Sequence, residues 1–467
     1  MGEVISDRGL MGRFKVLARV DGLDLSSEQG RARERLRRVA LTTLASAAAK
    51  AIAMAASLIS VPLTLNYLGA ERFGLWVTIS SANVILEFAD LGLGNGLLNV
   101  VATAGARGER ELVRRYVSSA SFLLLGLAIV ISAGFILLSP LAPWARVFGE
   151  SSRGLIPDAR AACAAFAATF AVSLPFGIVR RVQLGFQEGF ASNLWQCLAS
   201  VLSLAALLAG IRAGAGLPVL VLCLLGAPAV VLAANWAVEF FYRRRWMLPS
   251  PMLFDWGTGA RLMRDGILFV TLQLAAPLSI SAMDPLIATS YLGLAGAADF
   301  AVAQRLFLFI VPMQGMWLMP LWPAYGEAMA RGDSAWMRRT LWRTTVLALA
   351  LSAMVSGAMV VFRAQVFSAW LHRPWSPPLE LAVPLALSVC VFSLGMATSM
   401  FLNGVNAIRE QAGVAVLMTV VATALKIWFC RLYGVAGIPW GMLVGYTAVM
   451  APFLVVVIRR RLAMLRY

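Results

Sequence analysis

Long apolar stretches separated by short polar connections run through almost the whole chain. Each is close to or above the roughly 18–20 residues that a helix needs to cross the hydrocarbon of a bilayer. Only helices or closed barrels satisfy the backbone in lipid, and these stretches are too long for barrel strands. The pattern predicts an all-α polytopic membrane bundle of about twelve transmembrane helices. The predicted spans are 39–68, 73–101, 116–138, 161–179, 191–211, 217–241, 266–292, 295–324, 344–362, 379–402, 412–429 and 435–458.

The polar segments predict how these helices are oriented. Residues 1–38 end in a cluster of arginines, and no short apolar stretch with a cleavage site precedes them, so we expect a basic cytoplasmic segment and no cleaved signal peptide. With this end inside, most of the 40 basic residues fall in cytoplasmic segments. This bias predicts an even number of spans with both termini in the cytoplasm. The basic residues left for the external loops are Arg72, Arg146, Arg153, Arg160, Arg212, Arg363, Arg373 and Arg431.

Two short motifs recur at the same offset of 224 residues. Tyr-Leu-Gly at 67–69 closes the first span and returns at 291–293, where it closes the seventh. Ala-Arg-Gly followed by an acid, at 106–109, returns at 330–333 after the eighth span. Because six spans bring the chain back to the same side, the repeat is parallel, which predicts two six-helix lobes related by an axis along the membrane normal.

The repeat also predicts the domain organisation. Spans 1–6 form a first lobe and spans 7–12 a second, and a basic cytoplasmic linker joins them. A cytoplasmic tail follows the last span. The predicted boundaries are 39–241 for the first lobe, 242–265 for the linker, 266–458 for the second lobe and 459–467 for the tail.

Composition excludes several classes of protein. The chain of 467 residues is 60% hydrophobic and 13% charged, whereas soluble proteins carry about 25% charged residues. Disorder and a single soluble domain are therefore excluded. The formal net charge is +17, but the basic residues sit in short clusters between apolar runs, so we do not expect a nucleic acid as partner.

The sequence predicts no metal centre, no cofactor and no catalytic residues. Five cysteines are scattered through apolar runs without a Cys-x-x-Cys pair, and His372 is the single histidine. The connections are too short to hold a folded catalytic domain, which typically needs about 50 residues or more. An enzyme such as a membrane glycosyltransferase or a polysaccharide polymerase is therefore not expected.

The first third of the chain carries a family resemblance. Its residues are VPLTLNYLG at 61–69, ERFGLW at 71–76, DLGLGN at 90–95 and ARG at 106–108, with LNG at 402–404 further on. This pattern resembles bacterial polysaccharide flippases, the O-antigen and exopolysaccharide translocases of the multidrug/oligosaccharidyl-lipid/polysaccharide exporter superfamily. The resemblance covers the whole chain in the number of spans and is specific mainly over residues 61–115.

The resemblance implies a fold and an activity. The implied fold is MATE-like, with two six-helix lobes around a central cavity in the bacterial inner membrane. The implied activity is transfer of a polyprenyl-diphosphate-linked oligosaccharide to the periplasmic leaflet, for lipopolysaccharide or other surface polysaccharides. Expected partners are this substrate, membrane lipids and polysaccharide polymerase or export proteins, with a proton or sodium ion as the coupling ion if transport is coupled.

Charged residues within the first-lobe spans are candidate site residues, because each costs about 2.5–3.5 kcal/mol at mid-helix. Lys50 lies among alanines near the middle of the first span. It is expected either to contact a diphosphate or sugar or to pair with Glu87 or Asp90. Asn83, Glu87 and Asp90 share one helix face at the predicted spacing, which suits proton or cation coupling or a structural polar seam. Arg180 lies at the cytoplasmic end of span 4, where it is expected to follow the positive-inside rule. The alternative is that it contacts the substrate headgroup on entry.

The second lobe carries its own candidates. Arg305 lies roughly 15 Å from the external end of span 8, at about 1.5 Å per residue, too deep to reach the interface. Asp284 precedes a proline, which suggests a hinge or a pair with Arg305. Lys426 lies near the end of span 11, where we expect it to snorkel. The candidate substrate-binding cations are thus Lys50, Arg180, Arg305 and Lys426, and the candidate ion-coupling carboxylates are Glu87, Asp90 and Asp284.

Three functions remain open from the sequence, one of them a lipid-II-type flippase. The oligosaccharide flippase is the leading hypothesis, with one cavity cation from each lobe, Lys50 and Arg305, holding the diphosphate. The alternative is a MATE-type cation-coupled multidrug antiporter, which needs a cavity dominated by carboxylates and aromatic residues. Glu87 and Asp90 keep that alternative open.

Overall fold

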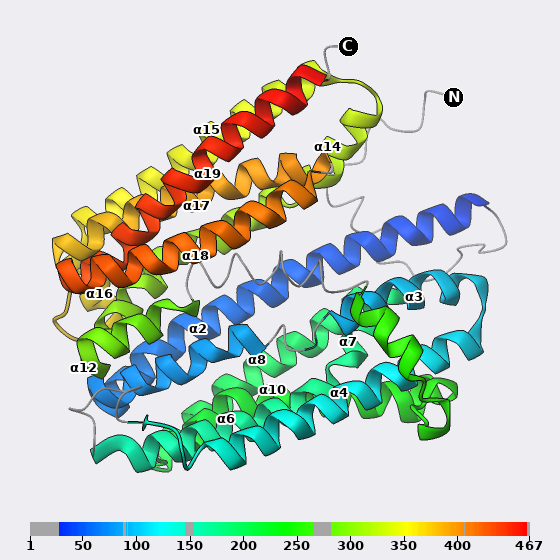
Figure 1. Cartoon of the computed structure of the whole chain (residues 1–467), viewed down its shortest axis with the longest axis horizontal. Helices are drawn as coiled ribbons and strands as arrows, with labels where there is room; N and C mark the ends of the chain where they lie inside the picture. The colour runs from blue at the N-terminus through cyan, green and yellow to red at the C-terminus, as the bar shows by residue number, and fades with distance from the viewer. Residues whose placement is uncertain are drawn as a thin grey trace.

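The computed structural model describes residues 28–86, 90, 92–144, 154–264, 282–405 and 407–464, and within these ranges the chain is helical, without strands. Two helical bundles follow each other along the chain (Figure 1). The first bundle contains α2 (Glu28–Leu86), α3 (Leu93–Arg107), α4 (Arg110–Leu138), α6 (Ile156–Phe176), α7 (Ile178–Gly185), α8 (Gly189–Arg212), α9 (Leu217–Val221), η2 (Leu222–Gly226), α10 (Ala227–Ala237) and η3 (Val238–Arg243).

Two short turns, η4 (Arg245–Met247) and η5 (Pro251–Leu253), follow the first bundle. The second bundle begins at residue 284. Its elements are α12 (Asp284–Leu308), α13 (Ile310–Leu318), α14 (Leu321–Ala330), α15 (Ser334–Val361), α16 (Arg363–Leu371), α17 (Leu379–Gly404), α18 (Ile408–Tyr433), η7 (Gly434–Ala436) and α19 (Gly437–Met464).

The described residues contain nine helical runs long and apolar enough to cross a membrane. Three of these runs are interrupted at a glycine, at Gly69 in 45–82, at Gly293 in 284–318 and at Gly434 in 410–457. With these interruptions, the nine runs contain parts of all twelve predicted spans. Large apolar side chains such as Val130, Val230 and Val420 are more than 60% exposed, as expected where a helix faces lipid. The chain is therefore a multi-pass membrane protein.

The interruptions reproduce the predicted repeat. Gly69 and Gly293, 224 residues apart, adopt φ and ψ of 75° and 172° and of 76° and 178°. Only glycine takes this backbone conformation readily, so the conformation explains why Tyr-Leu-Gly ends in glycine at both places. The figure shows α2 turning back on itself (Figure 1).

The second motif also has the same structure in both halves. Gly108 and Gly332 have φ values of 74° and 72° and follow the ends of α3 and α14. The next residue donates its N–H five residues back in each case, Glu109 to the Ala104 carbonyl at 3.0 Å and Asp333 to the Ala328 carbonyl at 2.9 Å. This is a helix-ending turn that needs the left-handed conformation. The parallel repeat is confirmed.

The two bundles meet beside α16 and α12 and diverge toward α3, α14, the beginning of α2 and the end of α19 (Figure 1). We call these the joined end and the open end. One cluster of buried apolar residues contains side chains from both bundles, among them Phe73 and Phe300, and it lies at the joined end. The other clusters each draw their buried residues from one side of this division.

Backbone packing of α2 on α12 forms the centre of the joined end. A Cβ atom placed on Gly74 would lie 1.9 Å from the carbonyl oxygen of Leu294, so only glycine permits this approach. Next to it, the hydroxyls of Thr78 and Thr289 are 2.6 Å apart. Earlier in α2, the side-chain amide of Asn66 donates to the carbonyl of Leu371 at 3.0 Å. These contacts hold the two bundles together without charged groups.

The structure corrects one helix prediction. Span 2 was expected to run continuously to residue 101 and to carry Asn83, Glu87 and Asp90 on one face. Instead, α2 ends at Leu86, α3 begins at Leu93 and Asp90 lies in a turn. Gly92, in the left-handed region at φ 82°, precedes α3 and makes this break. The helical spacing therefore does not extend to Asp90, and Glu87 lies outside the described residues.

We predict that Gly74→Ala destabilises the protein by about 1–3 kcal/mol, because the added methyl group forces α2 and α12 apart. The measurement is thermal unfolding of the purified protein in detergent. Gly126→Ala is the matched control, since a Cβ on Gly126 of α4 meets nothing within 4 Å. Equal stability of the two variants would contradict the close packing at the joined end.

Candidate functional site

A cavity of about 1090 Å³ lies between the two bundles and extends into the first. Helix α2 contributes one of its faces, and α6, α8 and α10 contribute most of the remaining first-bundle wall. The second bundle contributes a smaller wall from α12 and the residues just before it. Its lining residues are Ala282, Pro285, Ala301, Gln304, Arg305 and Leu308.

The α2 wall consists of small residues and hydroxyls at helical spacing. Ala53, Ser57, Ser60 and Thr64 follow one another at intervals of three or four residues, so they share a face. The Thr64 hydroxyl donates to the Ser60 carbonyl at 2.7 Å, and the Ser60 hydroxyl donates to the Ser57 carbonyl at 3.0 Å. The hydroxyls thus satisfy themselves on their own helix and leave an open, weakly polar surface.

Arginines dominate the charge of the cavity wall. Arg180 and Arg181 of α7 line it from the first bundle, and Arg305 of α12 lines it from the second. Asp90 is the single carboxylate among the described lining residues. Its oxygen lies 3.9 Å from Arg181, which also donates to the Asn95 side chain at 3.0 Å. The described wall is therefore net positive, and one arginine already has a carboxylate nearby.

Arg305 reaches across the cavity from one bundle to the other. Its guanidinium donates to the hydroxyl of Ser57 on α2. Within the part of the chain that the structure describes, Arg305 has no carboxylate partner, and its side chain is exposed. The expected pair between Arg305 and Asp284 does not form. A guanidinium that contacts only a neutral hydroxyl is available for a phosphate, which binds arginine more strongly.

Lys50 lies on the same face of α2 as the cavity wall, one turn before Ala53 and toward the open end. It is exposed, and its ammonium group lies 3.7 Å from the Met319 sulfur, which belongs to the second bundle. Among described residues, no ion pair of Lys50 with Asp90 forms. Lys50 therefore stands near the entrance of the cavity and does not line it.

Lys426 and Asp284 form a buried ion pair inside the second bundle. The Lys426 ammonium group donates to Asp284 at 2.5 Å, and the Gln304 amide donates to the other Asp284 oxygen at 2.6 Å. The exposed fractions are 0% for Lys426 and 2% for Asp284. The expectation that Lys426 snorkels is thus wrong, because its ammonium group is buried against Asp284, and substrate binding by Lys426 stays a prediction. Asp284 begins α12 and ties it to α18, and the neighbouring Pro285 lies in the first turn.

Close packing of α19 against α18 explains why the Lys426 side chain does not reach the membrane–water interface. Gly437, Gly441 and Gly445 recur every fourth residue along α19 and face α18. A Cβ on Gly441 would lie 2.5 Å from the backbone nitrogen of Lys426. Such small-residue spacing lets two membrane helices approach closely. The glycine pattern is visible in the sequence and is the signal that would have placed Lys426 in a helix interface.

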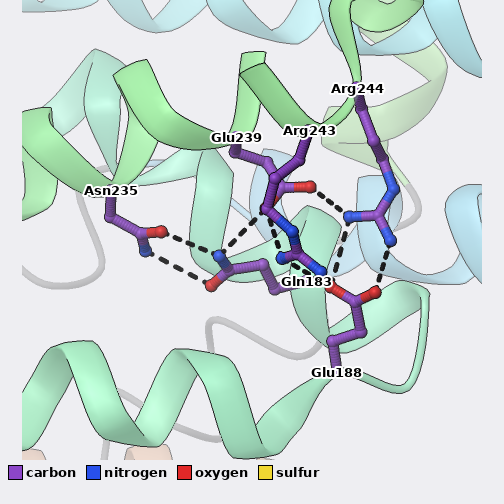
Figure 2. Close-up of polar contacts among 6 residues, drawn as sticks. All are labelled: Gln183, Glu188, Asn235, Glu239, Arg243 and Arg244. Atoms are coloured by element: carbon purple, nitrogen blue, oxygen red, sulfur yellow. Dashed lines mark hydrogen bonds and ion pairs between the residues drawn. The ribbon is translucent and has the colours of Figure 1, made fainter. Parts of the chain in front are cut away.

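A second charged network joins α7, the turn before α8 and the end of η3 in the first bundle (Figure 2). Arg243 donates to Glu188 and Glu239 at 3.0 Å each, and Arg244 pairs with both acids as well. Glu239 is buried and also accepts from Gln183 at 3.3 Å. Two of the linker arginines that indicated a positive cytoplasmic surface are therefore neutralised by Glu239, which is close in sequence, and by Glu188, which is distant.

This network connects to the cavity through two amides. Gln183 donates to the Asn235 side-chain oxygen at 2.8 Å, and Asn235 lines the cavity. Burial alone raises the pKa of Glu188, but hydrogen bonds and charge from Arg244 and Arg243 lower it below the usual value of 4.5. Glu188 therefore stays ionised, and it holds the turn before α8 against the end of η3.

Comparisons with known proteins agree with this geometry. The sequence model of the family described as "Polysaccharide biosynthesis protein" matches residues 40–329. Among proteins of curated function, none matches the sequence. Several solved structures share the fold.

One similar structure is the inward-facing conformation of a multidrug resistance MATE family transporter of the MOP superfamily, 16% identical, with a TM-score of 0.74, covering 88% of this chain and 95% of that one. A MOP superfamily transporter from Pyrococcus furiosus is 15% identical, with a TM-score of 0.64 and coverage of 93% and 97%. The lipid II flippase MurJ in an inward closed conformation is 11% identical, with a TM-score of 0.68 and coverage of 90% and 89%. The expected MATE-like fold is confirmed.

We predict that Lys426→Met destabilises the protein by about 3–5 kcal/mol, because it leaves Asp284 charged and unpaired in the bundle. The double variant Asp284→Asn with Lys426→Met should lose much less, since it removes both charges. Thermal unfolding in detergent measures both. Lys50→Met, which removes an exposed lysine, is the control. A double variant as unstable as Lys426→Met would contradict a role for the pair in neutralising buried charge.

We also predict that Glu188→Gln lowers the unfolding temperature at pH 7. The folded-state pKa of Glu188 is depressed, so its stabilisation is present above the usual pKa of 4.5 and is lost as the pH falls through the folded value. The difference between wild type and Glu188→Gln should therefore narrow below pH 4.5. Glu327→Gln, which removes an exposed partner of Arg331, should show little difference at any pH. A gap that stays constant with pH would refute this account of the network.

Proposed function

Because the chain belongs to the polysaccharide biosynthesis protein family, we propose that it is a flippase for a polyprenyl-diphosphate-linked oligosaccharide. The substrate moves from the cytoplasmic to the periplasmic leaflet for surface polysaccharide synthesis. The observation that carries this proposal is Arg305, which lines the cavity and donates to the neutral hydroxyl of Ser57 with no carboxylate partner among the described residues. A diphosphate needs such a cationic, partly enclosed site.

The orientation of the proposed flippase follows from its basic residues. We place both termini, and with them the open end, in the cytoplasm of a bacterium, with the protein in the inner membrane. The described conformation then has its open end toward the leaflet in which a lipid-linked oligosaccharide is made. The joined end, with Gly74 against Leu294, closes the periplasmic side. Rocking of one bundle against the other exposes the cavity to alternate sides.

The contact between Arg305 and Ser57 gives the proposed cycle a trigger. It joins the two bundles inside the cavity, and its acceptor is neutral. A substrate diphosphate offers charged oxygens to the same guanidinium, and charge-assisted hydrogen bonds are roughly twice as strong as neutral ones. Substrate binding therefore replaces a contact between the bundles with a contact to the substrate and frees them to move. Lys50, near the entrance and facing Met319, supplies a second cation on the way in.

The cation-coupled multidrug antiporter remains the second candidate, because the fold is shared with MATE transporters. The described cavity wall favours the flippase, since Arg305 faces the cavity without a carboxylate partner among the described residues. Ion coupling through Glu87, Asp90 or Asp284 stays a prediction in both cases. Loss of surface polysaccharide in a deletion strain supports the flippase, whereas drug sensitivity with intact polysaccharide supports the antiporter.

We predict that Arg305→Ala reduces transport of a fluorescent polyprenyl-diphosphate oligosaccharide in proteoliposomes by about tenfold to a hundredfold. The estimate is the loss of about 1.5–3 kcal/mol for hydrogen bonds to a charged group. Arg305→Lys should retain part of the activity. Arg331→Ala is the control, because Arg331 pairs with Glu327 on the surface.

Two substitutions at Ser57 test the trigger separately. Ser57→Asp gives Arg305 an internal carboxylate and should abolish transport although the cation is retained. Ser57→Ala removes only the neutral acceptor and should transport at close to the wild-type rate. Full activity of Arg305→Ala would end the proposal that the cavity binds a diphosphate, and full activity of Ser57→Asp would end the proposed trigger.

A further inference from the structure

A second cavity, of about 730 Å³, lies on the second bundle between α15 and α17. It shares no lining residue with the central cavity. Most of its lining comes from one face of α15, including Arg338, Arg339, Trp342 and Thr345, while Thr398 contributes from α17. We call it the α15–α17 groove. The proposed transport cycle gives it no role.

The groove lies at the level of a membrane surface. Helix α15 has 28 residues and is therefore about 42 Å long, which exceeds the roughly 30 Å of bilayer hydrocarbon. Its first turns at the open end thus extend into the headgroup region. Arg338 and Arg339 lie in those turns, and Trp342, one turn further, is 72% exposed. Tryptophan prefers this interface because its ring is amphipathic.

Three polar groups of the groove, Arg338, Arg339 and Thr345, lack partners among the described residues. Among the described residues, neither Arg338 nor Arg339 forms an ion pair, and the nearby acids are engaged elsewhere. Asp333 accepts from the Trp336 backbone at 3.0 Å, and Glu327 pairs with Arg331 at 2.6 Å. The hydroxyl oxygen of Thr345 is buried without a hydrogen-bond partner within the described chain. Two cations and one hydroxyl therefore face an open volume.

The repeat provides an internal comparison. Arg339 is the equivalent of Arg115 in the first bundle, at the offset of 224 residues. There, the chain supplies the anion, because Asp255 of the linker pairs with Arg115 at 3.1 Å. The Ser119 hydroxyl accepts from the Asp255 backbone at 3.0 Å and holds this segment in place. No described segment covers Arg339 in the same way, so the second bundle leaves the equivalent arginine for an external anion.

We propose that the α15–α17 groove binds the phosphate headgroup of an anionic phospholipid from the leaflet at the open end. Arg338 and Arg339 bind the phosphate oxygens, and Thr345 donates from the groove floor. Trp342 packs against the glycerol and the first methylenes of the acyl chains. Basic pockets between helices at a membrane surface bind such headgroups. The exposed tryptophan and the position at the interface favour a phospholipid over a free phosphate ion.

The test uses the full chain and native mass spectrometry in detergent with added phosphatidylglycerol or phosphatidylcholine. Wild type should bind phosphatidylglycerol preferentially, and Arg338→Gln with Arg339→Gln should weaken this binding about tenfold or more. The matched control is Arg331→Gln with Arg343→Gln, which removes the same charge from the same end of the bundle without touching the groove. It should bind as wild type does.

Further measurements separate the remaining outcomes. Arg338→Lys with Arg339→Lys keeps the charge but loses the forked geometry, so it should bind with intermediate affinity. It also keeps the test decisive if the glutamine variant fails to fold, because wild-type affinity in the lysine variant then overturns the proposal.

Millimolar inorganic phosphate should not displace the phospholipid, and displacement would indicate a free-anion site instead. Equal phosphatidylglycerol binding by the glutamine variant and its control would also overturn the proposal. Preferential binding of a polyprenyl diphosphate to the groove would overturn it in favour of a substrate entry site.

Discussion

Backbone contact between α2 and α12 is the interaction on which the arrangement of the molecule depends. Gly74 lies against the Leu294 carbonyl, and the hydroxyls of Thr78 and Thr289 meet beside it. Because the two bundles are fixed at this end by uncharged, closely packed surfaces, the polar volume between them lies away from it. A contact made by glycine and threonine is also one that separates without exposing charge to lipid, as alternating access requires.

Charge in this protein follows a clear division. Where arginine or lysine holds helices together, it meets a carboxylate, as in Lys426 with Asp284 and in Arg244 with Glu188. Two cations that face the space between the bundles instead meet a neutral group, Arg305 with Ser57 and Lys50 with Met319, whereas Arg181 on the cavity wall has Asp90 nearby. The partner of each described cation is therefore a better guide to its role than its depth in the membrane. A cation paired with a carboxylate is already neutralised within the structure. A cation that contacts a neutral group can still attract an anionic ligand.

The sequence predicts the fold well because the bilayer restricts it. Spans, repeat and lobes follow from apolar length and from two motifs whose glycines, Gly69 and Gly293, need a special backbone conformation. The break before α3 is missed because an apolar pattern continues through it, although Gly92 lies at that place. At the site, Arg305 was identified from its depth alone. Its partner Ser57 cannot be identified from the sequence, because a serine within a span is common and its contact with Arg305 depends on how the two bundles pack.

Lys426 and the linker arginines show what the sequence does not contain. Asp284 lies 142 residues from Lys426, and Glu188 lies 56 residues from Arg244, so only the packing of helices brings these pairs together. The short distance of Lys426 from the end of its span predicts that its side chain reaches the membrane–water interface. In the structure, α19 packs closely against α18 at this residue, and the side chain is buried. The glycines of α19, spaced every fourth residue, are the local feature that indicates such packing.

The pair of Lys426 and Asp284 has an electrical consequence. Both residues belong to the same bundle and sit 2.5 Å apart, so they travel together when that bundle tilts. A single charge carried across the membrane would exchange about 2.3 kcal/mol with each 100 mV of potential. A matched plus and minus moving as one unit exchanges almost nothing. This pair therefore adds almost no voltage dependence to the tilting of its bundle.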